Sequence, residues 1–475
     1  MSINTTEPTY APQAAGADST PPPVRRLRGG TFSALVEPNY RKYLTGAFVS
    51  NIGTWMQRVA QDWLVLELSG GSGLALGITT GLQFLPMLLL SPYGGVIADR
   101  FNKQQILKLT QSWMALCAAA LGVLAVTGVA TTEHVYVIAF VFGLGTAFDN
   151  PARQSFVSEV AGPDHLPNAI GLNSATFHAA RIVGPALAGL VIAAVGSGWA
   201  ILANALSYVA FIAALLLMDS RLLRTTPPTP RAKRQIREGL AYVRSKPNMV
   251  LVMCVVFFVG TFGLNFQMTS ALMAQQEFHR SAQAYGILGT LMAVGSLAGA
   301  LTAARRRSAP SPRLVVGMAV IFGLVEAVIG LAPSYATYAA MLPVLGLVTL
   351  LTLTAANATI QLGVDPLRRG RVMALYIMVL MGGTAIGSPI IGWIGQTMGP
   401  RWTLLVGGAA TVVGVLASVF VLQLRSRRAG NSRPQGEPGV TGSLEDAPAF
   451  TERGRRCPDS RGPARLGRRR GVPEN

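Results

Sequence analysis

Long runs without a charged side chain constrain this sequence more than any other feature. A transmembrane helix needs about 20 largely apolar residues to cross the hydrocarbon core of a bilayer. Only 13% of the residues are charged, whereas an ordinary soluble domain has about 25%. Nine stretches of spanning length carry no charge or a single acid, Glu326: 75–98, 109–129, 199–218, 248–276, 281–304, 314–333, 335–364, 372–398 and 402–424. The sequence therefore predicts an all-α membrane protein.

Three further stretches have spanning length but contain charges. The stretch 44–68 holds Arg58, Asp62 and Glu67, the stretch 135–151 holds Asp149, and the stretch 169–194 holds Arg181. Together with the nine cleaner stretches they bring the predicted number of transmembrane helices to twelve.

The distribution of Lys and Arg supports this number and predicts the orientation. Nineteen basic residues lie in every second connection, around 99–108, 149–168, 219–246, 305–313 and 365–371. The alternate connections hold only Arg280 and Arg401. Connections rich in Lys and Arg stay in the cytoplasm, so we expect a multi-pass protein of the inner (plasma) membrane with both termini cytoplasmic. A net charge of +19 could also suggest a nucleic-acid partner, but the basic residues are scattered between apolar runs and form no single face.

Composition divides the chain into five predicted parts. Residues 1–40 and 425–475 are polar tails, which we expect to be disordered and cytoplasmic. Two six-helix bundles, 41–218 and 247–424, flank a cytoplasmic linker, 219–246. Within the linker, Ile236, Leu240 and Val243 follow helical spacing among basic residues. This pattern predicts an amphipathic helix on the inner membrane surface, although a solvated basic linker would also fit.

An internal repeat relates the two bundles. A shift of 203 residues aligns five positions of the chain. The matched pairs are Pro163 with Pro366, Gly184 with Gly387, Gly189 with Gly392, Gly196 with Gly399 and Trp199 with Trp402. Repeats of this kind place a substrate site near the membrane midplane, between the halves.

Glycines also recur at helical spacing, which predicts close contacts between helices. Small residues let transmembrane backbones approach one another. For any single glycine, static packing is the simpler explanation. The glycines concerned are Gly73, Gly77 and Gly81 in one stretch and Gly383, Gly387 and Gly392 in another.

A conserved type of loop motif follows the second predicted span. It comprises Gly95, Asp99, Arg100, Asn102 and Lys103, and it resembles the loop signature of the major facilitator superfamily. The resemblance implies twelve helices in two pseudo-repeated bundles and a latch at Asp99. Asn102 stands at the family's glycine position, where we expect a tight turn with positive φ. We also expect Gly95 to permit close packing.

A second motif lies in the fifth predicted span. Gly184, Pro185, Ala188 and Gly189 resemble the Gly-Pro-x-x-Gly-Gly motif of the drug:proton antiporter branch of that superfamily, which implies export. The runs 55–63 and 148–156 are similar to those of the enterobactin-exporter-like permeases. The resemblance covers about residues 38–424.

Polar residues inside the first span are candidates for energy coupling. A charge at the centre of a span costs roughly 2.5–3.5 kcal/mol on insertion scales. Arg58 and Asp62 lie four residues apart on one helical face and can pair. The pair is either structural or makes Asp62 a proton carrier controlled by Arg58. Gln57 and Gln61 extend the same polar stretch and are cavity candidates.

Three more spans contribute candidates with open interpretations. Arg181, with His178 one turn earlier, is either a cavity residue or part of a structural pair. Glu326 is either a second proton site or a wet interfacial acid. Asp149 and Arg153, at the inner end of the fourth span, form either a gate or a structural clasp.

The remaining function classes are less compatible with the sequence. No phosphate-binding Gly-x-x-x-x-Gly-Lys-Ser/Thr loop occurs, which disfavours an ATP-driven pump. The four histidines and three cysteines are isolated, so we expect no metal, no cofactor and no enzyme activity. A channel suits two repeated halves less well than alternating access. We therefore predict a secondary transporter that exchanges a small lipophilic molecule (a drug, siderophore or secondary metabolite) for protons, with uptake of a solute as the alternative.

Overall fold

The computed structural model describes residues 32–224, 235–306, 308–365 and 368–431. Most of the two tails, 1–31 and 432–475, and part of the linker lie outside these ranges, so their predicted disorder is untested. Within the described ranges the secondary structure is helical, without strands. This agrees with the predicted all-α class.

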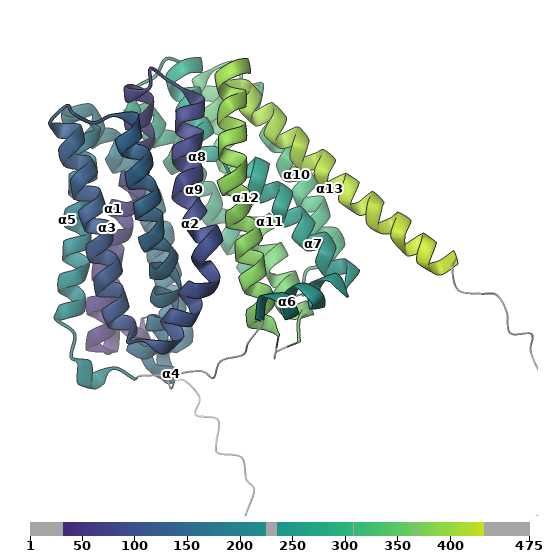
Figure 1. The fold of residues 1–475 in the computed structure, drawn as a ribbon, viewed down its shortest axis with the longest axis horizontal. Helices are drawn as coiled ribbons and strands as arrows, with labels where there is room; N and C mark the ends of the chain where they lie inside the picture. The colour runs from purple at the N-terminus through teal and green to yellow at the C-terminus, as the bar shows by residue number, and fades with distance from the viewer. Residues whose placement is uncertain (1–31, 225–234, 307, 366–367, 432–475) are drawn as a thin grey trace, which may run out of the picture. The chain divides into compact units, whose positions relative to one another are not determined.

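The helices follow one another through short connections (Figure 1). Those of the first half are η1 (Ser33–Val36), α1 (Pro38–Leu68), α2 (Gly73–Arg100), α3 (Lys103–Val126), α4 (Thr132–Val195), α5 (Ser197–Leu216) and η2 (Ser220–Leu222). The linker helix is α6 (Gln235–Arg244). Those of the second half are α7 (Pro247–Phe258), η3 (Val259–Gly263), α8 (Phe266–Leu272), η4 (Met273–Glu277), α9 (Ala282–Ala304), α10 (Pro312–Gly330), α11 (Tyr335–Gly363), α12 (Arg369–Met398) and α13 (Pro400–Asn431).

The twelve predicted spans are present in these helices. By length and hydropathy, ten helical segments of the described chain are able to cross a membrane. One of them, α4, has 64 residues and contains two spans, because Gly162 breaks it with a φ of +69°. The charged α1, of 31 residues, supplies the twelfth span.

The seventh span departs from the predicted continuous helix over 248–276. It consists of α7, the π-helical turn η3, the short helix α8 and a second π-helical turn, η4. Backbone groups that leave the regular pattern need other partners inside a membrane. The Asn265 amide donates to the Thr261 carbonyl at 2.9 Å, and the Thr384 hydroxyl of α12 donates to the Gly260 carbonyl at 3.1 Å. The irregular turns are thereby tied to α12.

Two helix crossings join the halves. α2 packs along α12, and the second span of α4 packs along α9 (Figure 1). A Cβ atom at Gly77 would overlap the Ser388 carbonyl oxygen, and one at Gly286 would overlap the Pro185 carbonyl oxygen. In both crossings the glycine also approaches a second glycine, Gly392 or Gly189, so that a Cβ would lie 3.1 Å from its Cα atom. The predicted close contacts of Gly73, Gly77, Gly81 and Gly392 are therefore present.

The partners in these crossings obey the predicted repeat. Residues 185 and 189 correspond to 388 and 392 under the shift of 203 residues. Gly196 and Gly399, another predicted pair, both end helices with positive φ, at +94° and +102°. We call the side of the protein with the connections 69–72 and 278–281 the arginine-poor end. Both crossings lie within the spans, close to this end.

The loop motif is arranged differently from the prediction. No atom lies within 4 Å of a Cβ built at Gly95, whereas Gly94 packs against the Ala147 carbonyl. Asn102 has a φ of −60° and caps α3, accepting a hydrogen bond from the Gln105 amide at 3.1 Å. The predicted turn with positive φ is therefore wrong, because an asparagine side chain can cap the next helix directly. The side chain of Asp99 lies outside the described part of the structure.

The linker helix α6 packs against the second half of the chain. Glu238 forms an ion pair with Arg371, and Gly239 lies against α12. The Tyr242 hydroxyl accepts a hydrogen bond from the Asp365 amide at 3.3 Å. Hydrogen bonding to Lys246, and then to this amide, lowers the pKa of Tyr242. Of the predicted apolar face, Val243 is buried and Leu240 is exposed, while the side chain of Ile236 is not described. The helix is therefore present, and its attachment is to α12.

Candidate substrate cavity and coupling residues

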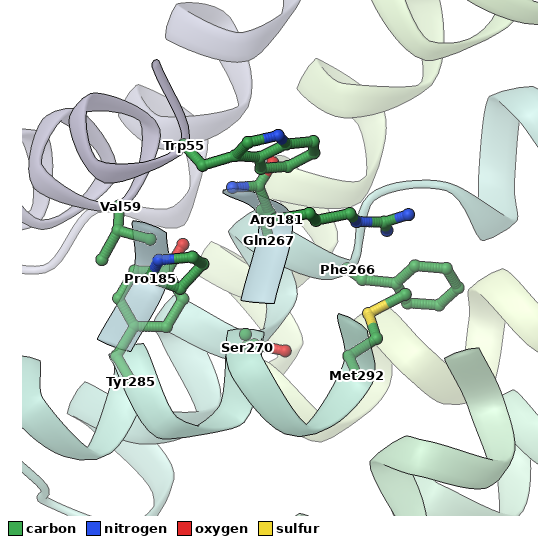
Figure 2. Close-up of a pocket in the computed structure, with 10 residues that line it drawn as sticks. Trp55, Val59, Arg181, Pro185, Phe266, Gln267, Ser270, Tyr285 and Met292 are labelled. Atoms are coloured by element: carbon green, nitrogen blue, oxygen red, sulfur yellow. The ribbon is translucent and has the colours of Figure 1, made fainter. Parts of the chain in front are cut away.

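A small cavity lies between the two halves. Figure 2 shows its lining side chains, which converge from α1, α4, α8 and α9. The cavity measures about 30 Å³, which is room for two or three water molecules. Its lining consists of Trp55, Val59, Arg181 and Pro185 from the first half and Phe266, Gln267, Ser270, Tyr285, Gly289 and Met292 from the second.

Helical spacing explains why these residues meet. Trp55 and Val59 are four residues apart on α1, and Arg181 and Pro185 are four apart on α4. Tyr285, Gly289 and Met292 follow one face of α9. Residues three and four apart lie on one helix face, so each helix presents a single stripe to the cavity. The break between η3 and α8 brings the fourth stripe, which starts at Phe266, to the same place.

Asp62 makes a hydrogen bond across the two halves. The Tyr285 hydroxyl of α9 donates to the Asp62 carboxylate of α1 at 2.8 Å. Both residues are buried, and the indole of Trp63 stacks on the Tyr285 ring with 6.3 Å between ring centroids. A titratable carboxyl therefore lies directly in the contact between α1 of the first half and α9 of the second.

The predicted ion pair between Arg58 and Asp62 is not formed. Among the described residues, no carboxylate lies within 4.0 Å of the Arg58 guanidinium. The guanidinium lies instead over the Trp55 ring, at 5.0 Å from its centroid, and near Phe84 at 5.7 Å. Sequence spacing placed both groups on one face, but it gave no indication of the aromatic rings and the tyrosine that bind them.

Arg181 stacks on the same indole. Its guanidinium lies 5.2 Å from the Trp55 ring centroid, and no carboxylate of the described chain pairs with it. His178, one turn earlier, contacts the ring of Phe177, and its buried Nδ1 atom has no hydrogen-bond partner within the described structure. Of the four cavity candidates, Arg181 lines the cavity.

The two glutamines of α1 are directed into the first half. Gln57 accepts a hydrogen bond from the Asn204 amide of α5 at 2.5 Å. Gln61 donates to Gln83 of α2 at 3.3 Å. Both glutamines are buried, so they join α1 to its neighbours and do not line the cavity.

Asp149 and Arg153 form an ion pair within α4. The Arg153 Nε and Asp149 Oδ2 atoms are 3.1 Å apart, one helical turn along the chain. Thr110 and Gln111 of α3 also donate to Asp149, at 2.8 and 2.7 Å. The arginine stacks on Phe211 of α5 at 4.6 Å. This network joins three helices of one half, the arrangement that the clasp interpretation expects.

Glu326 lies in a closed environment in α10. The residue is 3% exposed, and its Oε2 atom has no hydrogen-bond partner within the described structure. Two glycines lie close to it, because Cβ atoms at Gly407 and Gly263 would lie 3.1 and 3.4 Å from its oxygens. Glu326 is not among the residues that line the cavity.

The two family motifs have separate structural roles. Lys103 forms a buried ion pair with Glu159 of α4 at 2.6 Å, while Arg100 is exposed. Gly184 packs on α1 beside Trp55, and Gly189 packs on α9 beside Gln283. The Gly-Pro motif therefore lies between one helix of its own half and one of the other half. Within the described residues, no cluster of three His, Cys, Asp or Glu side chains could hold a metal ion.

Comparison with known proteins identifies the family. A family model described as "Transmembrane secretion effector" (MFS_3) matches residues 29–447. The chain belongs to this family of the major facilitator superfamily. It is 23% identical to the staphyloferrin A transporter of Staphylococcus aureus over 387 residues, covering 80% of this chain and 95% of the relative. It is 27% identical to the multidrug efflux pump Tap of Mycolicibacterium fortuitum over 391 residues, covering 80% and 91%. The family and these relatives are membrane transporters and not enzymes.

Solved structures show the same fold. The nucleoside transporter NupG matches with a TM-score of 0.62 at 13% identity, covering 80% of this chain and 98% of the other. A bacterial homologue of the lysosomal transporter Spinster, crystallised in an inward-facing, unoccupied conformation, matches with a TM-score of 0.61 at 16% identity, covering 84% and 100%. The major facilitator fold predicted from the loop motif and the repeat is confirmed.

Proposed function

We propose that this transporter exports a small lipophilic molecule across the plasma membrane in exchange for protons. The relative named multidrug efflux pump Tap supports export, and the staphyloferrin A transporter is a second relative that is named for a transported molecule. The Gly-Pro motif at Gly184 and Pro185 and the similarity to the enterobactin-exporter-like permeases point the same way. Proton coupling rests on one observation, which is the hydrogen bond between Asp62 and Tyr285 across the two halves.

The proposed orientation makes the arginine-poor end the outer end. Both termini and the arginine-rich connections then lie in the cytoplasm. The helices are closely packed at the glycines of both crossings. In this proposal, the described conformation is therefore the one with a closed outer end. The two bundles, 41–218 and 247–424, are the parts that rock against each other, and the linker 219–246 connects them.

Burial of Asp62 supplies the coupling. Closing the outer end moves the carboxyl group out of water and places it between α1 and α9. A buried carboxylate is costly unless it is well paired, and in the described structure Asp62 accepts one hydrogen bond, from a neutral tyrosine. Its charged neighbour Arg58 is engaged with aromatic rings. A neutral, protonated Asp62 therefore favours the closed outer end, and an ionised Asp62 favours opening.

This order of events moves protons inward and substrate outward. From the closed conformation, Asp62 releases its proton toward the cytoplasm, and the substrate-loaded protein opens outward. A proton from outside then neutralises Asp62 and allows the outer end to close again. Lys103, Asp149 and Arg153 hold the inner parts of the first half together during this cycle.

Inside-out vesicles loaded with an acidic lumen test the proposal. We expect gradient-driven accumulation of a fluorescent lipophilic probe such as 2-naphthoate, and its loss in Asp62→Asn with binding retained. Glu67→Gln, on the same helix but exposed, is the matched control and should transport normally. Normal gradient-driven transport by Asp62→Asn together with its loss in Glu326→Gln would move the proton site to Glu326. Accumulation only in right-side-out vesicles would indicate the uptake alternative.

A further inference from the structure

We propose that Arg58, Trp55 and Arg181 form a binding site for an anionic group of the transported molecule, a carboxylate above all. The inference deepens the proposed export function by naming a substrate class, and it rests on that function only in taking the bound molecule to be the transported one. The three side chains come from α1 and α4, and two of them, Trp55 and Arg181, line the cavity between the halves (Figure 2).

Among the described residues, the two arginines have no carboxylate partner. The Cζ atoms of Arg58 and Arg181 lie 5.0 and 5.2 Å from the ring centroid of the same indole, that of Trp55. In the described chain, neither pairs with a carboxylate or donates a hydrogen bond to a protein group. Asp62, the nearest acid on α1, is engaged by Tyr285. The cavity wall therefore carries more positive than negative charge.

Magnitudes show that the indole alone does not account for two arginines here. A cation gains less free energy from lying over an aromatic ring than an arginine loses on insertion at the centre of a span. Two guanidiniums that share one ring also repel each other. The arrangement is therefore suited to a bound negative charge, which would offset the positive charges of both arginines.

The geometry suits a planar anion on an apolar body. A guanidinium presents parallel N–H donors that match the two oxygens of a carboxylate. Trp55 fixes the position of both donors, and Val59, Pro185, Phe266 and Met292 supply apolar surface beside them. A lipophilic cation would meet the like charge of Arg181 at this wall and that of Arg58 on the same indole, so the site selects against it.

Equilibrium binding of three matched probes tests the inference. The purified full-length protein in nanodiscs is offered radiolabelled 2-naphthoate, 2-naphthalenemethanol and 2-naphthylmethylammonium at one pH and without a gradient. We expect the anion to bind at least tenfold more tightly than the cation. Arg58→Gln and Arg181→Gln should each weaken naphthoate binding about tenfold and leave the neutral alcohol unchanged. Arg181→Lys, which keeps the charge, should retain part of the affinity.

Arg280→Gln is the matched control, because Arg280 also stacks on an aromatic ring, Tyr335 at 5.7 Å, but does not line the cavity. It should bind naphthoate as the wild type does. Failure of naphthoate to bind, or an anion preference that survives in the Arg58→Gln, Arg181→Gln double variant, would overturn the inference. Because no gradient is applied, loss of proton coupling in Asp62→Asn leaves this result unaffected, and the two proposals fail separately.

Discussion

The two crossings between the halves have the same backbone geometry and different surroundings. In each, a glycine lies against the carbonyl oxygen of a residue at position 185 or 388, and against the glycine four residues later. Around the crossing of α2 with α12, the interactions are between uncharged groups, such as the Gly73 amide with Gln396 at 2.8 Å. The crossing of α4 with α9 contains Pro185 and Tyr285, which both line the cavity. The Tyr285 hydroxyl also donates a hydrogen bond to Asp62.

This difference separates two tasks that an alternating-access protein has to perform. The repeat supplies two equal contacts about which the halves can close. In the proposed cycle, the side chains added to one of them make closure bury an acid and complete a binding wall. We therefore expect the α2–α12 crossing to act in closure alone, and the α4–α9 crossing to act in closure, binding and coupling.

Valine at Gly77 and Gly286, one glycine from each crossing, should have the largest effect on transport. The two substitutions should also differ in their effect on binding, which would separate the two crossings. Gly77→Val and Gly286→Val both force the helices apart, because the added atoms would overlap backbone. Overpacking of this kind costs about 1–3 kcal/mol, so gradient-driven transport should fall about tenfold or more in both variants. Naphthoate binding should weaken only in Gly286→Val, since that substitution displaces the cavity wall.

Gly317→Val on α10 is the control for both, because no described atom lies within 4 Å of its Cβ position. It should transport normally. Equal loss of naphthoate binding in Gly77→Val and Gly286→Val would show that the two crossings do not divide their tasks in this way.

A smaller effect is expected from Tyr285→Phe, which removes one hydroxyl and keeps the ring on Trp63. A hydrogen bond of this kind contributes about 0.5–1.5 kcal/mol, more when its acceptor is charged. At alkaline pH, where Asp62 is ionised, the fraction of protein with a closed outer end should fall threefold to tenfold. At acidic pH the change should be smaller. Access of a membrane-impermeant thiol reagent to Cys introduced at Ser281, on the outer side, measures this fraction. Equal access at both pH values would contradict the role given to the hydroxyl.

Much of the fold could be predicted from the sequence because a bilayer leaves few solutions. The apolar runs and the alternating arginines give twelve spans, and the shift of 203 residues gives the relation between Gly189 and Gly392. The interruption of the seventh span was not predicted. Its backbone is stabilised by Asn265 of the same span and by Thr384 of α12, and a partner as distant along the chain as Thr384 leaves no local signal.

The candidate site was only partly predictable, for a related reason. The sequence indicates which charged residues lie inside the membrane, but not which groups contact them. Arg58 and Asp62 have the spacing of a pair, yet an indole and a phenol from other turns and helices bind them instead. Gln57 and Gln61 have the polarity of cavity residues but bind to α5 and α2. The helical spacing of Tyr285, Gly289 and Met292 was the one available signal for the opposite wall.

The central claim is that the protonation state of Asp62 controls the outer end. Spin labels at Val129→Cys and Leu331→Cys, two exposed positions at the arginine-poor ends of opposite halves, report its opening in a background without the native cysteines. Pulsed electron paramagnetic resonance in nanodiscs should show a short distance at acidic pH and a larger share of a long distance at alkaline pH. Asp62→Asn, which mimics the protonated acid, should give the short distance at both. A pH-dependent distance that persists in Asp62→Asn would contradict the account.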